Sequence, residues 1–228
     1  MGKVITIDGP SGVGKGTVGR VLAKTLGWGW LDSGALYRLT ALHAQQQHID
    51  LNNQIAVAKI AEHLPVTFDI DHGDEPFVLL ADQDVTQDIR TETCGNAASK
   101  IAAYPPVRQA LLQRQRDFLT ERGLVADGRD MGTVIFPNAP VKIFLQASAQ
   151  VRAERRFKQL QQQSTAVNFN TILQEIETRD LRDRTRAISP LIPAADALVI
   201  DTSDLTVDQV FQQIMAEVKK VFIKGAEK

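Results

Sequence analysis

Residues 7–17 of this chain read IDGPSGVGKGT, and they follow a short apolar run at Val4–Ile7. A β-rich apolar run of this length that ends at a glycine loop predicts a buried strand. After the loop, apolar residues recur at helical spacing until Gly27, which is a stop signal. These apolar residues are Val18, Val21, Leu22 and Leu26. The stretch therefore predicts a strand, a glycine-rich loop and a helix in direct succession.

The loop itself, Gly9–Lys15, matches the pattern G-x-x-x-x-G-K, which binds phosphate when it lies between a strand and a helix. Glycines let the backbone curl so that N–H groups point inward, and the following helix adds the positive end of its dipole. A glycine-rich turn with a surface lysine is the alternative, which the register of both glycines with Lys15 disfavours. Gly16 replaces the usual Ser or Thr and Thr17 follows, which weakens the expectation of a hydroxyl ligand to Mg²⁺ there. The loop is predicted to hold phosphate.

Further apolar runs of strand length alternate with helical patterns along the chain. The expected strands are 28–31, 124–126, 141–145 and 197–200. Pro105-Pro106 opens a predicted helix that stops at Gly123, and 207–218 forms a final amphipathic helix. Strands separated by helices favour parallel pairing with right-handed crossovers. The expected fold class is α/β, with a five-stranded parallel sheet at its core.

One segment breaks the alternation of strands and helices. Residues 66–71 alternate strictly between apolar and polar side chains, which indicates a strand with one face in water. A turn is expected at 72–75, a second strand at 77–81 and another turn at 82–84. These signals predict a small antiparallel insert from about residue 63 to residue 95.

The composition restricts the class of protein. The chain has 228 residues, with 26 Lys and Arg against 27 Asp and Glu, which disfavours a dedicated nucleic-acid-binding or membrane-surface protein. Cys94 is the single cysteine, so no intrachain disulfide forms and a reducing cytoplasm is expected. Neither a signal peptide nor an apolar membrane span is evident, and the histidines lack metal-ligand spacing. We therefore expect a cytoplasmic protein with no nucleic-acid and no membrane partner. Because no apolar surface stripe stands out, we expect a monomer.

The arginines are candidates for a second anion site. Arg179, Arg182 and Arg186 fall on one face of a predicted helix, and Arg184 falls on another. An exposed ladder of Arg–Asp ion pairs is the alternative, but four arginines in eight residues of a near-neutral protein favour phosphate binding. For the arginines within 152–156, a solvated helix face is as good an explanation as a function.

Ligands of open parallel sheets bind beyond the carboxyl ends of the strands. Two predicted strands are followed there by polar residues, in LDSGALYR (31–38) and ADGRD (126–130). We expect Ser33, Arg38, Asp127 and Arg129 to converge with the loop. Asp127 ends an apolar strand and is the candidate carboxylate for Mg²⁺, directly or through water.

Several classes of nucleotide-binding protein fit these features. A signalling GTPase would carry an N-K-x-D motif after a later strand, and none is present. A motor or ATPase module would need a partner surface, which one sequence does not reveal. A small-molecule kinase needs a second anion site facing the loop, and the arginines favour this class.

Five motifs together resemble those of the bacterial cytidylate kinases. They are GPSGVGKGT (9–17), LDSGALYR (31–38), NAASKIAAYPPVR (96–108), ADGRDMGTVIFP (126–137) and RDLRDRTRAISPL (179–191). The resemblance runs nearly end to end and includes the antiparallel insert. It implies a P-loop core in three pieces (1–62, 101–149 and 188–228), an antiparallel insert of the CMP-binding region (63–100) and an Arg-rich helical lid (150–187).

The resemblance also implies a reaction, in which ATP with Mg²⁺ phosphorylates CMP and dCMP, and a role for each matching residue. ATP phosphates are expected on Gly9, Pro10, Ser11, Gly12, Val13, Gly14, Lys15, Gly16 and Thr17. Cytosine is expected to be read by Ser99, Arg108 and Asp130. The acceptor phosphate is expected on Arg38, Arg129 and Arg186, with Ser33 nearby, and the ribose on Arg179 and Asp183. The expected catalytic cations are Lys15, Arg129, Arg184 and Arg186, and Asp127 is expected to hold Mg²⁺ through water.

Two other functions stay open at this point. The chain could be a kinase on the same scaffold that acts on another monophosphate or on a metabolite hydroxyl. It could also be a nucleotide-binding regulatory module with no acceptor. A panel of acceptors in an ADP-release assay separates these possibilities.

Overall fold

The computed structural model describes residues 2–69, 77–162 and 167–223. The chain divides into two compact units, of which unit 1 comprises residues 1–32 and 116–228 and unit 2 comprises residues 33–115. The glycine-rich loop and the arginines of 179–186 belong to unit 1, so their geometry is described together. Within the described ranges, every helix is too short or too polar to cross a membrane.

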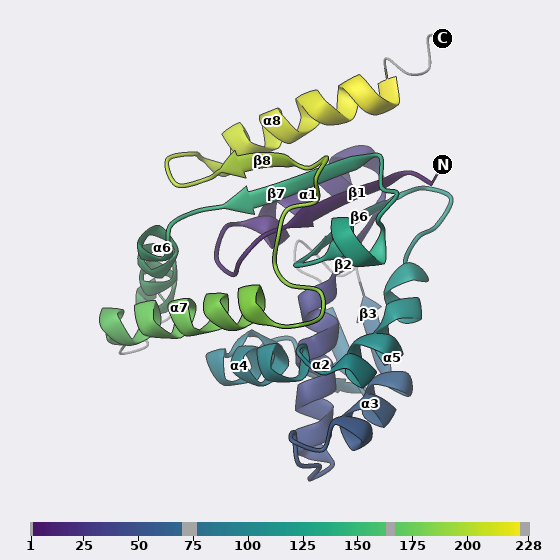
Figure 1. Ribbon diagram of the computed structural model, residues 1–228, viewed down its shortest axis with the longest axis vertical. Helices are drawn as coiled ribbons and strands as arrows, with labels where there is room; N and C mark the ends of the chain where they lie inside the picture. Colours follow the sequence, from purple (N-terminus) through teal and green to yellow (C-terminus); the bar gives the residue numbers. More distant parts are fainter. Residues whose placement is uncertain (1, 70–76, 163–166, 224–228) are drawn as a thin grey trace. The chain divides into compact units, whose positions relative to one another are not determined.

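Unit 1 is built on a five-stranded parallel sheet with the strand order β2-β6-β1-β7-β8 (Figure 1). The strands are β1 Val4–Asp8, β2 Gly29–Asp32, β6 Leu124–Gly128, β7 Val141–Gln146 and β8 Leu198–Asp201. Every residue of the central strand β1 is buried, as expected of a parallel strand covered on both faces. Because β1 and β6 are in register as far as Asp8 and Gly128, the chain leaves both strands at the same edge of the sheet. The five-stranded parallel sheet predicted from the sequence is confirmed.

Two helices pack on this sheet and share its core. They are α1 Lys15–Leu26 and α8 Val207–Val218. Val18 and Leu22 of α1 and Ile214 of α8 are buried together with the inner residues of β1 and β7. A capping box starts α8, in which Thr206 and Gln209 accept from each other's backbone N–H. This packing fixes α1, and therefore the loop that precedes it, against the central strand.

The segment predicted as a lid contains two helices, α6 Ala149–Gln162 and α7 Phe169–Thr185. Asn168 caps α7 by accepting from the backbone N–H groups of residues 170 and 171. Phe157 of α6 meets Phe169 of α7 edge to face, with 5.9 Å between the ring centroids. Two short helical turns complete unit 1, η2 Met131–Ile135 and η3 Lys219–Ile223.

Unit 2 holds a three-stranded antiparallel sheet of order β3-β4-β5. Its strands are β3 Val66–Asp69, β4 Phe77–Leu80 and β5 Gln83–Asp84. Its helices are α2 Ser33–Gln46, α3 Gln54–Glu62, η1 Asp88–Arg90, α4 Glu92–Ile101 and α5 Pro105–Arg116. The antiparallel sheet lies inside the predicted insert, 63–100. The compact unit begins earlier, at residue 33, because α2 packs against α3 and α4.

Some local predictions need correction. The turn predicted at 82–84 is in fact a two-residue turn at Ala81 and Asp82, whose φ angles are 49° and 63°, followed by strand β5. Two consecutive positive φ angles give the twist that a tight hairpin needs. Helix α5 ends at Arg116 and does not reach Gly123. The turn predicted at 72–75 and residues 70–71 of the predicted strand lie outside the described residues.

Candidate active site

The glycine-rich loop joins the end of β1 to the start of α1. Gly9, Gly12 and Gly14 have positive φ angles of 150°, 82° and 92°. A Cβ on Gly9 would lie 2.2 Å from the carbonyl oxygen of Leu145, so no other residue fits there. Gly14 is the N-cap of α1 in the left-handed conformation, which places the first N–H groups of the helix directly after the loop. This conformation is suited to an anion.

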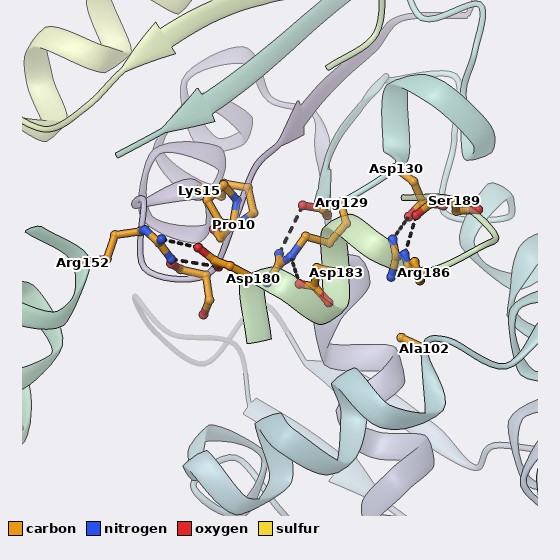
Figure 2. Close-up of polar contacts among 12 residues, drawn as sticks. Pro10, Lys15, Ala102, Arg129, Asp130, Arg152, Asp180, Asp183, Arg186 and Ser189 are labelled. Carbon is orange, nitrogen blue, oxygen red and sulfur yellow. Dashed lines mark hydrogen bonds and ion pairs between the residues drawn. The ribbon is translucent and has the colours of Figure 1, made fainter. Parts of the chain in front are cut away.

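Lys15 is folded back over this loop. Its Nζ donates to the carbonyl oxygen of Pro10 at 2.7 Å, and the residue is 7% exposed (Figure 2). Burial lowers the pKa of Lys15 to about 7, and the neighbouring charge of Arg129 contributes in the same direction. The carboxylates of Asp127, Asp32 and Asp8 act in the opposite direction. An anionic ligand at the loop would favour the charged form of Lys15.

Two carboxylates end neighbouring strands beside Lys15. Asp32 of β2 and Asp127 of β6 are paired in register, and the indole N–H of Trp30 donates to Asp127 Oδ2 at 3.0 Å. Burial raises the pKa of Asp127 to about 8, and repulsion from Asp32 adds to the effect. A cation near this pair would relieve that repulsion, so its chemistry fits Mg²⁺, which takes one or two carboxylates and keeps several waters. In the described ranges, no three His, Cys, Asp or Glu side chains gather to form a metal cage.

The predicted anion-binding arginines of unit 1 are held by carboxylates from a second element. Arg129, directly after β6, donates from Nε to Asp183 Oδ2 of α7 at 2.9 Å. Burial opposes the ionised form of Asp183, but Arg129 holds the pKa of that carboxyl below its usual value, with help from Arg179 and Arg186. The ion pair therefore orients the guanidinium of Arg129.

Arg186 follows the last turn of α7. Its Nη2 lies 3.8 Å from Asp130 Oδ1, and its Nε donates to the carbonyl oxygen of Ser189 (Figure 2). Asp130 is 2% exposed, so the predicted base-reading carboxylate is buried beside a predicted phosphate-binding arginine. The structure thus brings Arg129 and Asp130 together with Asp183 and Arg186, and Asp183 lies 54 positions after Arg129.

The remaining arginines of α7 differ in their surroundings. Arg179 and Arg182 are half-buried, whereas Arg184 is exposed. The exposure of Arg184 agrees with its place on another helical face. Its predicted role as a catalytic cation depends on a ligand that reaches this side of α7.

The other predicted substrate residues belong to unit 2. Ser33 donates to Gln115 Oε1 at 2.7 Å, and Arg38 donates to the carbonyl oxygens of Ile89 and Thr91 at 2.6 and 3.2 Å. Ser99 is buried, at 6% exposed. Arg108 donates to the carbonyl oxygen of Ala102 at 3.1 Å, and its guanidinium lies 5.7 Å from the centroid of the Tyr37 ring. These partners keep Ser33, Arg38 and Arg108 in a defined place within unit 2.

Arg152 is a residue whose importance the sequence did not reveal. It is 2% exposed, pairs with Asp180 of α7 through two nitrogens, and donates to the carbonyl oxygen of Ser11 in the glycine-rich loop at 3.0 Å (Figure 2). Its Nε also donates to Ala147 at 3.1 Å. The periodicity of 152–156 indicated a shared face, but the partner lies 28 positions away and carries no sequence signal.

The chain is similar to known proteins over nearly its whole length. The model of the cytidylate kinase family matches residues 5–220. The chain is 52% identical to a cytidylate kinase of Pectobacterium carotovorum subsp. carotovorum (strain PC1), over 97% of this chain and 98% of that protein. It is 54% identical to a cytidylate kinase of Sodalis glossinidius (strain morsitans), with 96% of each chain covered. A cytidylate kinase of Yersinia enterocolitica serotype O:8 / biotype 1B is 53% identical, over 96% of this chain and 94% of that one.

Proposed function

The chain belongs to the cytidylate kinase family, and on that premise we propose that it transfers the γ-phosphate of ATP to CMP and dCMP. The observation that carries this proposal is the position of the anion-binding groups in unit 1. The glycine-rich loop follows β1, Arg129 and Asp130 follow the adjacent strand β6, and their partners come from α7 and the residues after it. Donor and acceptor groups would therefore lie at one edge of the sheet.

The donor phosphates would bind the N–H groups of residues 9–17 and the ammonium of Lys15. Phosphoryl transfer depends on in-line positioning and neutralisation of charge more than on covalent catalysis. Lys15 is buried next to the loop and its pKa is lowered, so phosphate binding would raise the pKa and keep the side chain charged. Mg²⁺ would be held through water by Asp127, and when bound it supplies charge neutralisation to the phosphates.

As the family resemblance implies, the acceptor phosphate would bind Arg38, Arg129 and Arg186, with Ser33 nearby. Guanidinium groups form paired hydrogen bonds with phosphate oxygens. Asp183 orients Arg129 at 2.9 Å, and with Arg179 it would bind the ribose. Arg184 and Arg186 would add positive charge at the transferred phosphoryl group. The helices α6 and α7 would exclude water from the transferred phosphoryl group. This exclusion would prevent hydrolysis of ATP, which competes with transfer.

Cytosine would be recognised by Asp130, Ser99 and Arg108. Cytosine carries an amino donor where uracil carries a carbonyl acceptor. An ionised Asp130 accepts a hydrogen bond from the amino group and repels the uracil oxygen. Unmatched polar groups in a desolvated pocket lower kcat/KM by several powers of ten. We expect Asp130→Asn to weaken CMP and to raise the ratio of kcat/KM for UMP to that for CMP.

A coupled ADP-release assay over a panel of acceptors tests the proposal. Turnover with CMP and dCMP, and much slower turnover with AMP, GMP, UMP and cytidine, is the expected result. Faster turnover with another monophosphate or with a metabolite hydroxyl would assign a different acceptor to the same scaffold. If no acceptor stimulates ADP release, the protein would instead be a nucleotide-binding regulatory module. We also propose that the protein is cytoplasmic and monomeric. Sedimentation with and without nucleotides would check the monomeric state.

A further inference from the structure

The residue before the glycine-rich loop carries a carboxylate that the proposed roles leave unused. Asp8 is the last residue of β1 and is 4% exposed. Its Oδ1 accepts from the backbone N–H of Met131 at 2.8 Å, and its Oδ2 accepts from that of Gly132, also at 2.8 Å. Both oxygens of one buried carboxylate are therefore engaged by one turn of the chain that begins more than a hundred residues later.

The two N–H groups belong to the first residues of η2 and have no acceptor within that turn. The N–H groups of residues 134 and 135 donate to the Asp130 carbonyl oxygen, and that of residue 136 donates to Met131. An ionised carboxylate accepts at two oxygens and satisfies both orphan donors. The fit is close, because a Cβ on Gly132 would lie 2.8 Å from Thr6 Oγ1 and 3.4 Å from Asp8 Oδ2.

This contact joins the donor loop to the acceptor site. Gly9, at the start of the loop, directly follows Asp8, and Arg129 and Asp130 directly precede Met131. We propose that Asp8 is a positioning residue, which holds the Arg129–Asp130 segment in place beside the loop and so keeps the acceptor site in the conformation that binds CMP. The inference rests on the proposed function, because it needs Arg129 and Asp130 to bind the acceptor.

Asparagine at this position would be a poor substitute. An amide has one acceptor oxygen, and its NH₂ group would face a second N–H donor, so one of the two contacts is lost. The loop keeps its own supports, since Lys15 still donates to Pro10 and Gly9 still lies against Leu145. Asp8 also favours the charged form of Lys15, but Asp127 and Asp32 do so more strongly and are unchanged. The change should therefore affect the acceptor side more than the donor side.

The test compares the full chain with Asp8→Asn and with a matched control, Asp201→Asn. Asp201 also ends a strand of this sheet and accepts a backbone N–H, from Ser203 at 2.9 Å, but it is exposed. In Asp8→Asn we expect the KM for CMP to rise about tenfold or more, while the Kd of ATP stays within about twofold. The control should match the wild type in both constants.

Two results would overturn the inference. The KM for CMP could be the same in Asp8→Asn as in the wild type, or it could rise together with the Kd of ATP. The second result would mean that Asp8 supports the loop itself. The first result would overturn the inference even if kcat were lower, because partial unfolding removes active enzyme without changing its affinity.

Hydrogen exchange in the unmodified protein gives an independent test that does not require the variant to fold. The amides of Met131 and Gly132 should exchange as slowly as those of residues 134 and 136, because Asp8 protects them. Rapid exchange of only the first two amides would overturn the inference. If the wild type lacked CMP kinase activity, the proposed function would be refuted. The exchange rates of the Met131 and Gly132 amides do not depend on that activity, so the two failures are distinguishable.

Discussion

The buried ion pair between α6 and α7 gives a sharp prediction for Asp180→Asn. Arg152 is 2% exposed, and two of its nitrogens donate to the Asp180 carboxylate. The substitution removes the negative charge and one of the two acceptor oxygens, so the Arg152 guanidinium stays buried with less compensation. Removing one partner of a buried pair costs about 3–5 kcal/mol.

The expected magnitude lies near the lower end of that range. Two carbonyl oxygens, those of Ser11 and Ala147, continue to accept from Arg152 at 3.0 and 3.1 Å. We therefore expect the free energy of unfolding to fall by about 3 kcal/mol, which corresponds to a decrease in Tm of about 6–12 °C for a chain of this size. Urea unfolding followed by circular dichroism measures the first value, and calorimetry measures the second.

The exposed pair of Lys220 and Glu217, 2.8 Å apart, provides the control. Glu217→Gln should change the free energy of unfolding by less than about 1 kcal/mol, because exposed pairs contribute little. The double variant Arg152→Met with Asp180→Asn should lose less free energy of unfolding than the two single variants together. Each single change leaves one buried charge unpaired, whereas the double change leaves none. Equal effects of Asp180→Asn and Glu217→Gln would refute the reasoning.

Three further predictions concern the site. Lys15→Met should lower kcat about 100- to 1000-fold in the ADP-release assay with the fold intact, and near-normal turnover would contradict the phosphate-loop role. Arg129→Lys should lower kcat/KM for CMP about tenfold or more, because Lys lacks the forked donors that contact both Asp183 and phosphate; a wild-type value would exclude that role. Burial and Asp32 raise the pKa of Asp127 from 3.8 to about 8, so its ionisation opposes folding as pH rises through that interval. Asp127→Asn should therefore be more stable than the wild type at pH 8, with the difference vanishing toward pH 4 in urea titrations; a difference independent of pH would contradict the assignment.

The parts of the fold that depend on local pattern could be predicted from the sequence. The strand at Val4–Ile7, the loop and the following helix carry their own signals, namely an apolar run, spaced glycines and helical periodicity. The alternation of residues 66–69 likewise indicated an antiparallel strand. Asp82 tolerates a positive φ angle, but Ala81 does not favour one, so the start of the turn at Ala81 could not be predicted. Gly and Asn are the residues that most often start such turns, and neither occupies position 81.

Tertiary partners were the part that could not be predicted. Arg152, Arg155 and Arg156 share one helical face, and Arg152 forms a buried ion pair because Asp180 of another helix packs against it. Asp8 directly follows the predicted strand Val4–Ile7, and its two acceptor contacts depend on a turn that lies 123 and 124 positions later. In both cases the role depends on a distant segment, and the residue type allows a solvated alternative.

The order of the strands has a consequence for synthesis of the chain. The central strand β1 pairs Val4 with Leu124 and Ile5 with Val141, so both of its neighbours are made more than a hundred residues later. At about 5–20 residues per second, the ribosome needs roughly 6–24 s to reach the first of them. During that interval the compact unit 33–115 emerges, while the apolar run 4–7 has no strand to pair with. Chaperone binding to the nascent N-terminus, released once residue 146 has left the ribosome, would protect the segment on which the phosphate loop depends.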